Sequence, residues 1–169
     1  MDHCWSVWLL PEAKDMETFR AYIETYSKLY ASNLFDPHVT LFGRLDIDPE
    51  PTFSFFNELR SEPGIEKIKN LYIQFGEPPW KTVHIKLDRD TRLLTLQKKI
   101  HKQFARYRNY RFDPHLSLAY GKFIPDKRDI DLISIKKTIS FSSLAIMHTP
   151  DQIEDWRLIK KFNFVKENI

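Results

Sequence analysis

Apolar and polar residues alternate or recur along the chain in patterns that predict a regular series of strands and helices. The apolar run WSVWLL at residues 5–10 is typical of a buried strand, and the alternation at residues 82–88 (TVHIKLD) predicts another. Further strands are predicted at residues 37–43, 65–75, 138–148 and 155–164, and within residues 112–121. Helices are predicted at residues 11–30, 52–60, 90–107 and 126–134.

The two longer predicted helices each carry a stripe of apolar residues. In the first helix, spacings of 3, 4, 3 and 4 separate Met16, Phe19, Ile23, Tyr26 and Tyr30. The second helix has a similar stripe, made of Leu93, Leu96, Ile100, Phe104 and Tyr107. We expect Pro11 to open the first helix, because proline is tolerated in the first turn. Each helix therefore has one face to bury.

A nearly identical segment occurs twice. Residues 35–43 are FDPHVTLFG and residues 112–121 are FDPHLSLAYG, and the two histidines are 115 − 38 = 77 positions apart. The same order of elements surrounds both copies: strand, helix, motif strand, short helix, strand. This duplication predicts an α+β fold with two lobes related by an approximate two-fold axis. Each lobe would be a small antiparallel sheet with helices packed on its outer side, and the active groove would lie between the lobes.

The length and composition indicate one ordinary globular domain. The chain has 169 residues, enough for one substantial core, and we predict a single bilobal domain over residues 1–169. The early apolar run ends before Pro11 and is therefore too short for a signal-peptide core or a membrane span. The single cysteine, Cys4, excludes an internal disulfide and a thiolate zinc cluster. We expect a cytoplasmic monomer that binds no membrane.

Positive charge is concentrated in one stretch. The net charge is only +3, but residues 91–112 contain no acid and seven basic residues, namely Arg92, Lys98, Lys99, Lys102, Arg106, Arg108 and Arg111. Such a block can attract phosphates. It is also typical of the solvated face of a basic helix, and this second interpretation is favoured because charge runs usually face water.

The repeated motif has the composition of a phosphoryl-transfer site. On a strand, His38 and Thr40 would share one face, and His115 and Ser117 would share another, with aliphatic residues opposite them. Two such strands facing each other would place two imidazoles and two hydroxyls around one substrate. In-line displacement at phosphorus needs a base on one side and an acid on the other, and histidine can serve as either near neutral pH. The hydroxyls can donate to the non-bridging oxygens.

A metal site is the main alternative use of the motif. Asp36 and Asp113 fall two positions before the histidines, and carboxylate with imidazole suits a transition metal. This interpretation leaves the repeated hydroxyl positions unused, so we predict no metal and no cofactor. A carboxylate that reached its histidine would instead raise the pKa of that imidazole. The sequence leaves the role of the two aspartates open.

Four segments resemble a known group of proteins. WSVWLLPE (5–12), PHVTL (37–41), PHLSLAY (114–120) and the tail at 144–164, with its Trp at position 156, are similar to the cyclic phosphodiesterase family. That family belongs to the two-histidine (2H) phosphoesterase superfamily, defined by two His-x-Thr/Ser motifs in a bilobal fold. The resemblance implies metal-independent opening of cyclic phosphodiesters, such as nucleoside 2′,3′-cyclic phosphates and ADP-ribose 1″,2″-cyclic phosphate, to monoesters.

The resemblance also suggests roles for individual residues. His38, Thr40, His115 and Ser117 fall on the catalytic positions. Trp8 and Tyr120 fall at substrate-binding positions near the base or ribose, although Trp8 equally suits core packing. The segment 76–81 departs from the family, and its Trp80 is either a wall of the site or a loop anchor. In the mechanism that we favour, His115 activates water and His38 protonates the leaving oxygen, although the near-symmetric motifs allow the reverse.

Three other functions remain open at this stage. One is an RNA-processing enzyme of the same superfamily that acts on cyclic-phosphate ends or 2′–5′ linkages, for which the basic block would bind the RNA. Another is a phosphodiesterase for cyclic oligonucleotides. The third is a non-catalytic nucleotide- or RNA-binding module, and intact paired motifs argue against it. The sequence does not identify the physiological cyclic phosphate.

Overall fold

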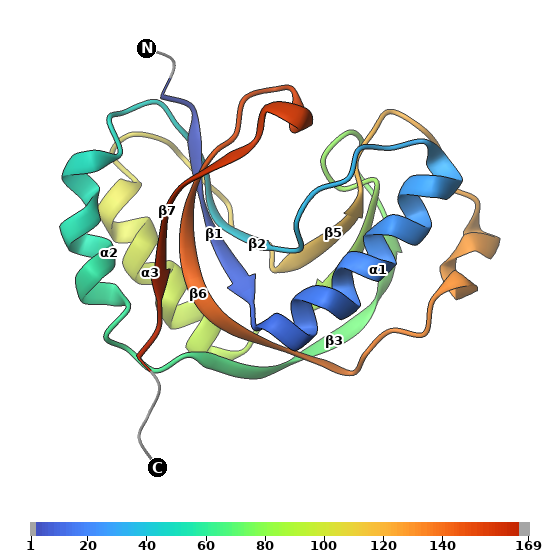
Figure 1. Ribbon diagram of the computed structural model, residues 1–169, viewed down its shortest axis with the longest axis horizontal. Helices are drawn as coiled ribbons and strands as arrows, with labels where there is room; N and C mark the ends of the chain where they lie inside the picture. The colour runs from blue at the N-terminus through green and yellow to red at the C-terminus, as the bar shows by residue number, and fades with distance from the viewer. Residues whose placement is uncertain (1–2, 166–169) are drawn as a thin grey trace.

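One curled antiparallel sheet joins strands from both halves of the chain (Figure 1). The computed structural model describes residues 3–165. The strands are β1 (Trp5–Pro11), β2 (Val39–Leu45), β3 (Ile65–Phe75), β4 (Val83–Leu87), β5 (His115–Ala119), β6 (Thr138–His148) and β7 (Arg157–Asn163). Their order in the sheet is β2-β1-β6-β3-β4-β5, and β7 pairs with β6. All of these strand pairs are antiparallel.

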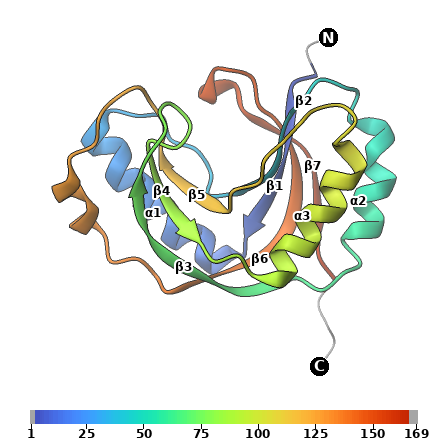
Figure 2. The same ribbon diagram turned by 180° about the vertical axis from the view of Figure 1, so that it is seen from behind.

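Helices lie outside the curl of the sheet, on both sides of the molecule. The α-helices are α1 (Ala13–Tyr30), α2 (Phe53–Leu59) and α3 (Thr91–Phe104). Three short 3-10 helices are η1 (Glu50–Thr52), η2 (Lys127–Leu132) and η3 (Ile153–Asp155). Helices α2 and α3 lie side by side next to β7, and α1 lies at the opposite end of the molecule (Figures 1 and 2). Within residues 3–165, no helix has the length and apolar character needed to cross a membrane.

The two lobes do not follow the two halves of the sequence. Strand β3 is long enough to pair twice: residues 65–69 pair with β6, and residues 70–75 pair with β4. Strand β6, in turn, pairs with β1. One lobe is therefore β2-β1-β6 with β7, and the other is β3-β4-β5. The predicted α+β class is confirmed. The last strand of each repeat, β3 in the first and β6 in the second, lies in the lobe of the other repeat, and the sheet is continuous across both lobes.

Most predicted elements are present, with differences at their ends. Pro11 is the last residue of β1 and pairs with Phe141, and α1 begins only at Ala13, so the prediction that Pro11 opens the helix is wrong. A strand end tolerates proline here because Pro11 lies beyond the last residue of β1 that pairs with β2. The predicted helix at residues 126–134 is the 3-10 helix η2. Strand β2 begins at Val39, two residues later than predicted.

Aromatic side chains hold the helices of the first lobe in place. The ring of Phe56 on α2 stacks on Phe104 of α3 and on Phe162 of β7, with centroids 5.9 and 5.4 Å away. All three rings are at most 2% exposed. The Trp5 ring meets Phe104 edge-on and donates a hydrogen bond to the carbonyl of Ile47 at 2.7 Å. This core fixes β2, which carries most of the first motif, and its neighbour β1.

The curl of the sheet brings its two edges together. Strands β2 and β5 are at opposite ends of the strand order, yet they contact each other across the concave side. Each of these strands carries one copy of the repeated motif. The fold therefore places the two motifs face to face, which a flat sheet of the same order would keep apart.

Candidate active site

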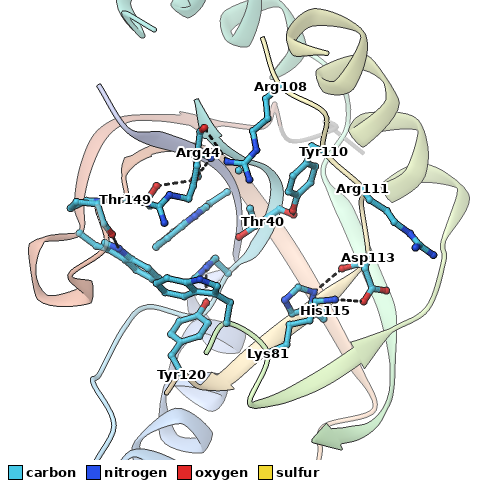
Figure 3. Close-up of a pocket in the computed structure, with 17 residues that line it drawn as sticks. Thr40, Arg44, Lys81, Arg108, Tyr110, Arg111, Asp113, His115, Tyr120 and Thr149 are labelled. Atoms are coloured by element: carbon cyan, nitrogen blue, oxygen red, sulfur yellow. Dashed lines mark hydrogen bonds and ion pairs between the residues drawn. The ribbon is translucent and has the colours of Figure 1, made fainter. Parts of the chain in front are cut away.

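The two motifs line one cavity between the lobes. The cavity has a volume of about 250 Å³, and both His38 and His115 contribute to its wall. Figure 3 shows His115 and Thr40 among the side chains that line it. Thr40 lines it too, from the strand position that pairs with Trp8. A cavity of this size suits a small ligand, and it lies where the sequence predicted the groove between lobes.

Both histidines are held in the same way by their own motif. The ring Nδ1 of His38 is 2.6 Å from the carbonyl oxygen of Asp36, and that of His115 is 2.7 Å from the carbonyl oxygen of Asp113. A carbonyl oxygen only accepts, so Nδ1 carries the proton and donates it in both cases. The other nitrogen, Nε2, is left to accept or deliver a proton. The repeated Asp-Pro-His thus fixes the tautomer through its backbone.

The two motif carboxylates point to cations instead of to the imidazoles. Asp36 accepts a hydrogen bond from Arg20 at 2.7 Å, and Asp113 accepts from Lys81 at 2.8 Å and from Lys86. Partial burial pushes the pKa of Asp113 upward, but the two lysines outweigh this and hold that pKa below its usual range. Among residues 3–165, no three His, Cys, Asp or Glu side chains gather in a way that could hold a metal ion.

The two motif hydroxyls differ in their access to the cavity. Thr40 lines it, whereas Ser117 lies beneath its wall, only 4% exposed. The Ser117 hydroxyl donates a long hydrogen bond of 3.4 Å to the carbonyl oxygen of Trp80. The structure therefore brings His38, Thr40 and His115 to the cavity surface and places Ser117 behind it. Their catalytic roles stay predictions.

Aromatic side chains form the wall around His38. Trp8 stacks flat on the His38 ring, and the Tyr120 hydroxyl donates to His38 Nε2 at 3.4 Å. Trp80, 39% exposed, meets Tyr120 edge-on at 5.6 Å. The ring centroid of Trp156, from the segment between β6 and β7, lies 5.3 Å from that of Trp8 and 6.3 Å from that of Trp80. All four rings line the cavity, where they can pack against a flat base.

Trp156 was missed as a site residue in the sequence analysis. It lies outside the repeat, so the duplication gave no signal for it. Its signal was the resemblance of the tail, which includes this tryptophan. The indole of Trp156 donates to the carbonyl oxygen of Pro150 at 2.9 Å, and this bond links two residues of the segment that both line the cavity.

His84 is a second residue that the sequence analysis missed. It pairs with Ser117 across β4 and β5, as Trp8 pairs with Thr40 across β1 and β2. Trp8 and His84 are therefore equivalent positions of the two lobes, and they are 84 − 8 = 76 positions apart, within the offset of the repeat. The rings of His84 and His115 lie edge to face with centroids 5.3 Å apart. The motif histidines thus have different neighbours: an indole beside one and an imidazole beside the other.

A comparison with protein families identifies the family of this chain. The model of cyclic phosphodiesterase-like proteins matches residues 1–168. The chain belongs to this family. The resemblance to the cyclic phosphodiesterase family that the motifs suggested is thereby confirmed. Among curated proteins, no match was found.

Solved structures share the fold of this cyclic phosphodiesterase-like protein. TT0787 of Thermus thermophilus is 14% identical and has a TM-score of 0.64, over 97% of this chain and 99% of its own. E. coli LigT complexed with 3′-AMP is 14% identical with a TM-score of 0.62, over 98% of this chain and 100% of its own. LigT complexed with NADP+ is 14% identical with a TM-score of 0.59, over 97% and 99%. At these identities the likeness shows the fold alone.

Burial controls the charge of both motif histidines in this cyclic phosphodiesterase-like protein. Desolvation lowers the pKa of His38 and of His115 to about 4, and the carbonyl bonds to Nδ1 offset only part of this. Nearby charges have smaller effects: His84 and Lys81 lower the pKa of His115, and Asp113 raises it. For His38, the charge of His115 lowers the pKa and that of Asp36 raises it. A bound phosphate anion acts in the opposite direction, because a negative charge beside an imidazole favours the protonated form.

The basic block divides between solvent and site. On α3, Lys99 pairs with Glu62 and Arg92 with Asp90, away from the cavity. Beyond the end of α3, Arg108 and Arg111 line the cavity together with Arg44 and Lys81. The basic residues on α3 therefore form a solvated face, as one interpretation of the sequence expected. The other interpretation, attraction of phosphates, has a physical basis only in the loop after α3.

Proposed function

We propose that the protein opens a five-membered cyclic phosphate on a ribose to a monoester, using His38 and His115 as acid and base. The substrates proposed are nucleoside 2′,3′-cyclic phosphates and ADP-ribose 1″,2″-cyclic phosphate. One observation carries the proposal: two imidazoles, each with Nδ1 held by a carbonyl two residues earlier, face one cavity from opposite edges of the sheet. Paired proton donors and acceptors are what in-line displacement at phosphorus needs.

In the proposed reaction, His115 Nε2 takes a proton from a water molecule. The water oxygen forms a new bond to phosphorus, and the bond from phosphorus to one ribose oxygen breaks on the opposite side. His38 Nε2 delivers its proton to that leaving oxygen, giving a phosphomonoester and a free hydroxyl. Thr40 donates to a non-bridging oxygen, and Lys81 balances the charge that builds there. Ser117 is proposed to act from behind the wall, through the Trp80 segment that its hydroxyl contacts.

The surroundings of the two histidines support this assignment of roles. His115 has Lys81 and His84 nearby, and positive charge beside an imidazole favours its neutral form, which is the base. His38 lies on the face of Trp8, and the electron-rich face of an indole stabilises a cation, which is the acid form. The raised pKa of Tyr120, caused chiefly by burial, keeps its hydroxyl neutral, and a neutral hydroxyl can accept a hydrogen bond from Nε2 of His38 once that nitrogen is protonated.

A small nucleotide ligand is supported by the wall of the cavity and by the neighbouring structures. Four aromatic rings beside His38 offer flat apolar surface for a base. Structures of LigT, which shares the fold, are complexes with 3′-AMP, NADP+ and phosphate. We propose that this chain binds its ligand in the cavity between the lobes, as a monomer and without a metal.

A panel of cyclic phosphates tests the proposal directly. Purified protein is incubated with each candidate in excess EDTA, and the products are identified by phosphorus NMR, including which ester bond remains. We expect hydrolysis of at least one ribose cyclic phosphate to a single monoester, unchanged by the chelator. Tight binding without turnover would support the non-catalytic module instead. Activity lost with EDTA and restored by one divalent ion would contradict the metal-independent mechanism.

A further inference from the structure

We propose that Arg44 and Arg108 form a second phosphoryl-binding subsite, which takes a phosphate on the 5′-oxygen of the same ribose that carries the cyclic phosphate. The inference rests on the proposed function and narrows its substrate class. In both candidate sources, a diphosphate-linked nucleotide and an RNA end, the ribose that carries the cyclic phosphate also bears a phosphoryl group on its 5′-oxygen. The same two arginines would recognise either one.

A bulge in β2 aims Arg44 into the cavity. Trp5 pairs with Leu45 and Val7 with Phe42, so Ser6 on β1 stands opposite two residues of β2. Arg44 is the second of these two and has a left-handed φ of 56°. Bulges and left-handed non-glycine residues concentrate beside functional sites, where they redirect a side chain.

Buried hydroxyls stabilise this unusual backbone. The amide of Arg44 donates to the Ser6 hydroxyl at 3.0 Å, and the Ser6 hydroxyl bonds to that of Thr149 at 2.7 Å. Ser6 and Thr149 are both at most 5% exposed. These buried hydrogen bonds therefore hold the left-handed backbone of Arg44 in place. This conformation costs energy, and the packing of β2 alone gives no reason for it.

Arg108 is brought to the same place by the loop after α3. One guanidinium nitrogen of Arg108 donates to the carbonyl oxygen of Arg44 at 3.2 Å. Tyr110 anchors this loop on β2, because its hydroxyl donates to the carbonyl oxygen of Thr40 at 3.2 Å and its ring packs on Phe42. Figure 3 shows Arg44 and Arg108 together on one side of Thr40, with His115 and Lys81 on the other.

Both guanidinium groups have capacity for a phosphate. Arg108 forms no ion pair with a carboxylate among residues 3–165. Arg44 pairs with Asp151, whose side chain is 78% exposed. An exposed pair of this kind contributes little, so a phosphate can compete for the arginine. A guanidinium offers several N–H donors in a plane, which matches the oxygens of a phosphate.

The charge of the cavity wall exceeds what the reacting phosphate needs. The fixed charges of the wall are four cations, Arg44, Lys81, Arg108 and Arg111, and one anion, Asp113. With Asp151, which pairs with Arg44 from outside the wall, the excess is 4 − 2 = +2. A cyclic phosphodiester carries one negative charge, and Lys81 is already on the side of His115. The excess beyond Thr40 is therefore suited to a second anionic group on the substrate.

Two substrates that differ by one phosphate test the subsite. Adenosine 2′,3′-cyclic phosphate is compared with its 5′-phosphorylated form, and kcat/KM is measured for each. In the wild type we expect the 5′-phosphate to raise kcat/KM by about tenfold or more. The reason is that charge-assisted hydrogen bonds from the arginines to a phosphate are stronger than hydrogen bonds between neutral groups. Raising the salt concentration should reduce the gain.

The variants separate the two arginines from the rest of the basic loop. Arg108→Ala and Arg44→Gly should each remove most of the gain and leave kcat/KM for the minimal substrate within about threefold, because the phosphate contact is the part removed. Glycine is chosen at Arg44 because it keeps the left-handed backbone. Arg106→Ala is the matched control, since that guanidinium lies over the ring of Tyr107 and does not line the cavity. It should keep the full gain.

Two further substrates identify the source of the phosphate. One is ADP-ribose 1″,2″-cyclic phosphate, and the other is a dinucleotide that ends in a 2′,3′-cyclic phosphate. A gain that depends on Arg108 with either substrate supports the subsite and names its class. Hydrolysis of the minimal substrate with no gain from any 5′-phosphate, or a gain that survives both arginine variants, would overturn the subsite while the proposed function stood. If none of these substrates were hydrolysed, both the subsite and the proposed function would be overturned.

Discussion

His38 lies flat against the indole of Trp8, with ring centroids 3.5 Å apart and planes inclined by 6°. His115, its counterpart in the repeat, has the imidazole of His84 edge-on instead, at 5.3 Å. The two motifs are almost identical in sequence and in their bonds to the backbone. Their difference lies in these neighbours, which come from the equivalent strands β1 and β4. The acid and the base can therefore be told apart by changing one neighbour at a time.

Replacing Trp8 should affect the acid. In Trp8→Leu the indole face is lost, so the protonated form of His38 is less stable and the pKa of His38 falls further. The high-pH limb of the kcat/KM profile should move to lower pH, and kcat at pH 7 should fall by about 2–30-fold, from a stacking contribution of roughly 0.5–2 kcal/mol. Movement of the low-pH limb alone would assign the acid to His115 instead.

Replacing His84 should affect the base. In His84→Gln the positive charge that His84 gains in acid is absent, so the pKa of His115 rises. The low-pH limb of the kcat/KM profile should then move to higher pH, while the high-pH limb stays in place. Circular dichroism of the variant provides the control for folding, because His84 is buried. A shift of the high-pH limb would contradict the assignment.

The four motif side chains should differ in their contribution to turnover. His38→Ala and His115→Ala should each reduce kcat by ~10²–10⁴, the usual contribution of a positioned acid or base. Thr40→Ala should cost on the order of 2–4 kcal/mol of transition-state stabilisation, as for one oxyanion donor. Ser117→Ala should cost less than Thr40→Ala, because Ser117 lies behind the wall. A histidine variant with near wild-type turnover would remove that residue from the mechanism.

The buried histidines should make the fold sensitive to acid. Burial lowers the pKa of His38 to about 4, below the 6.5 of an exposed imidazole, so the unfolded chain binds the proton more tightly. The stabilising contribution is complete above pH 6.5 and is lost as the pH falls from 6.5 towards 4.

The loss from His38 amounts to roughly 3–4 kcal/mol at most, since the pKa is lowered from 6.5 to about 4 and each pKa unit corresponds to about 1.4 kcal/mol. Urea unfolding at pH 7.5 and 4.5 measures it, and His38→Gln should lose less stability between these pH values than the wild type. His101→Gln on α3, outside the cavity, is the control. An equal loss in His38→Gln and wild type would show that His38 does not titrate in this way.

Much of the fold followed from local pattern. Periodicity predicted β3 and β6 to the residue, and the stripe from Met16 to Tyr30 predicted α1. The exchange of β3 and β6 between the lobes was not predictable, because both halves carry the same strand pattern and pairing partners depend on contacts across the whole sheet. The start of α1 was misplaced because Pro11 is equally compatible with a strand end.

The candidate site was predictable where the repeat marked it. His38, Thr40 and His115 reach the cavity, as do the proposed contact residues Trp8, Trp80 and Tyr120. Arg44 was not predictable, because its direction depends on a bulge that no local pattern indicates. The role of the aspartates was also not predictable. The histidines donate to the backbone carbonyl oxygens of Asp36 and Asp113 and not to their carboxylates.

The pH dependence of kcat/KM for a hydrolysed ribose cyclic phosphate, measured from pH 3 to 9, tests the central claim most directly. If one histidine acts as base and the other as acid, the profile is bell-shaped, because the base is lost at low pH and the acid at high pH. Burial lowers the pKa of both His38 and His115, so the maximum should lie on the acid side of neutrality. The two apparent pKa values belong to the pair. A flat profile from about pH 5 to 9, which brackets the ordinary pKa of histidine, would contradict proton transfer by the two imidazoles.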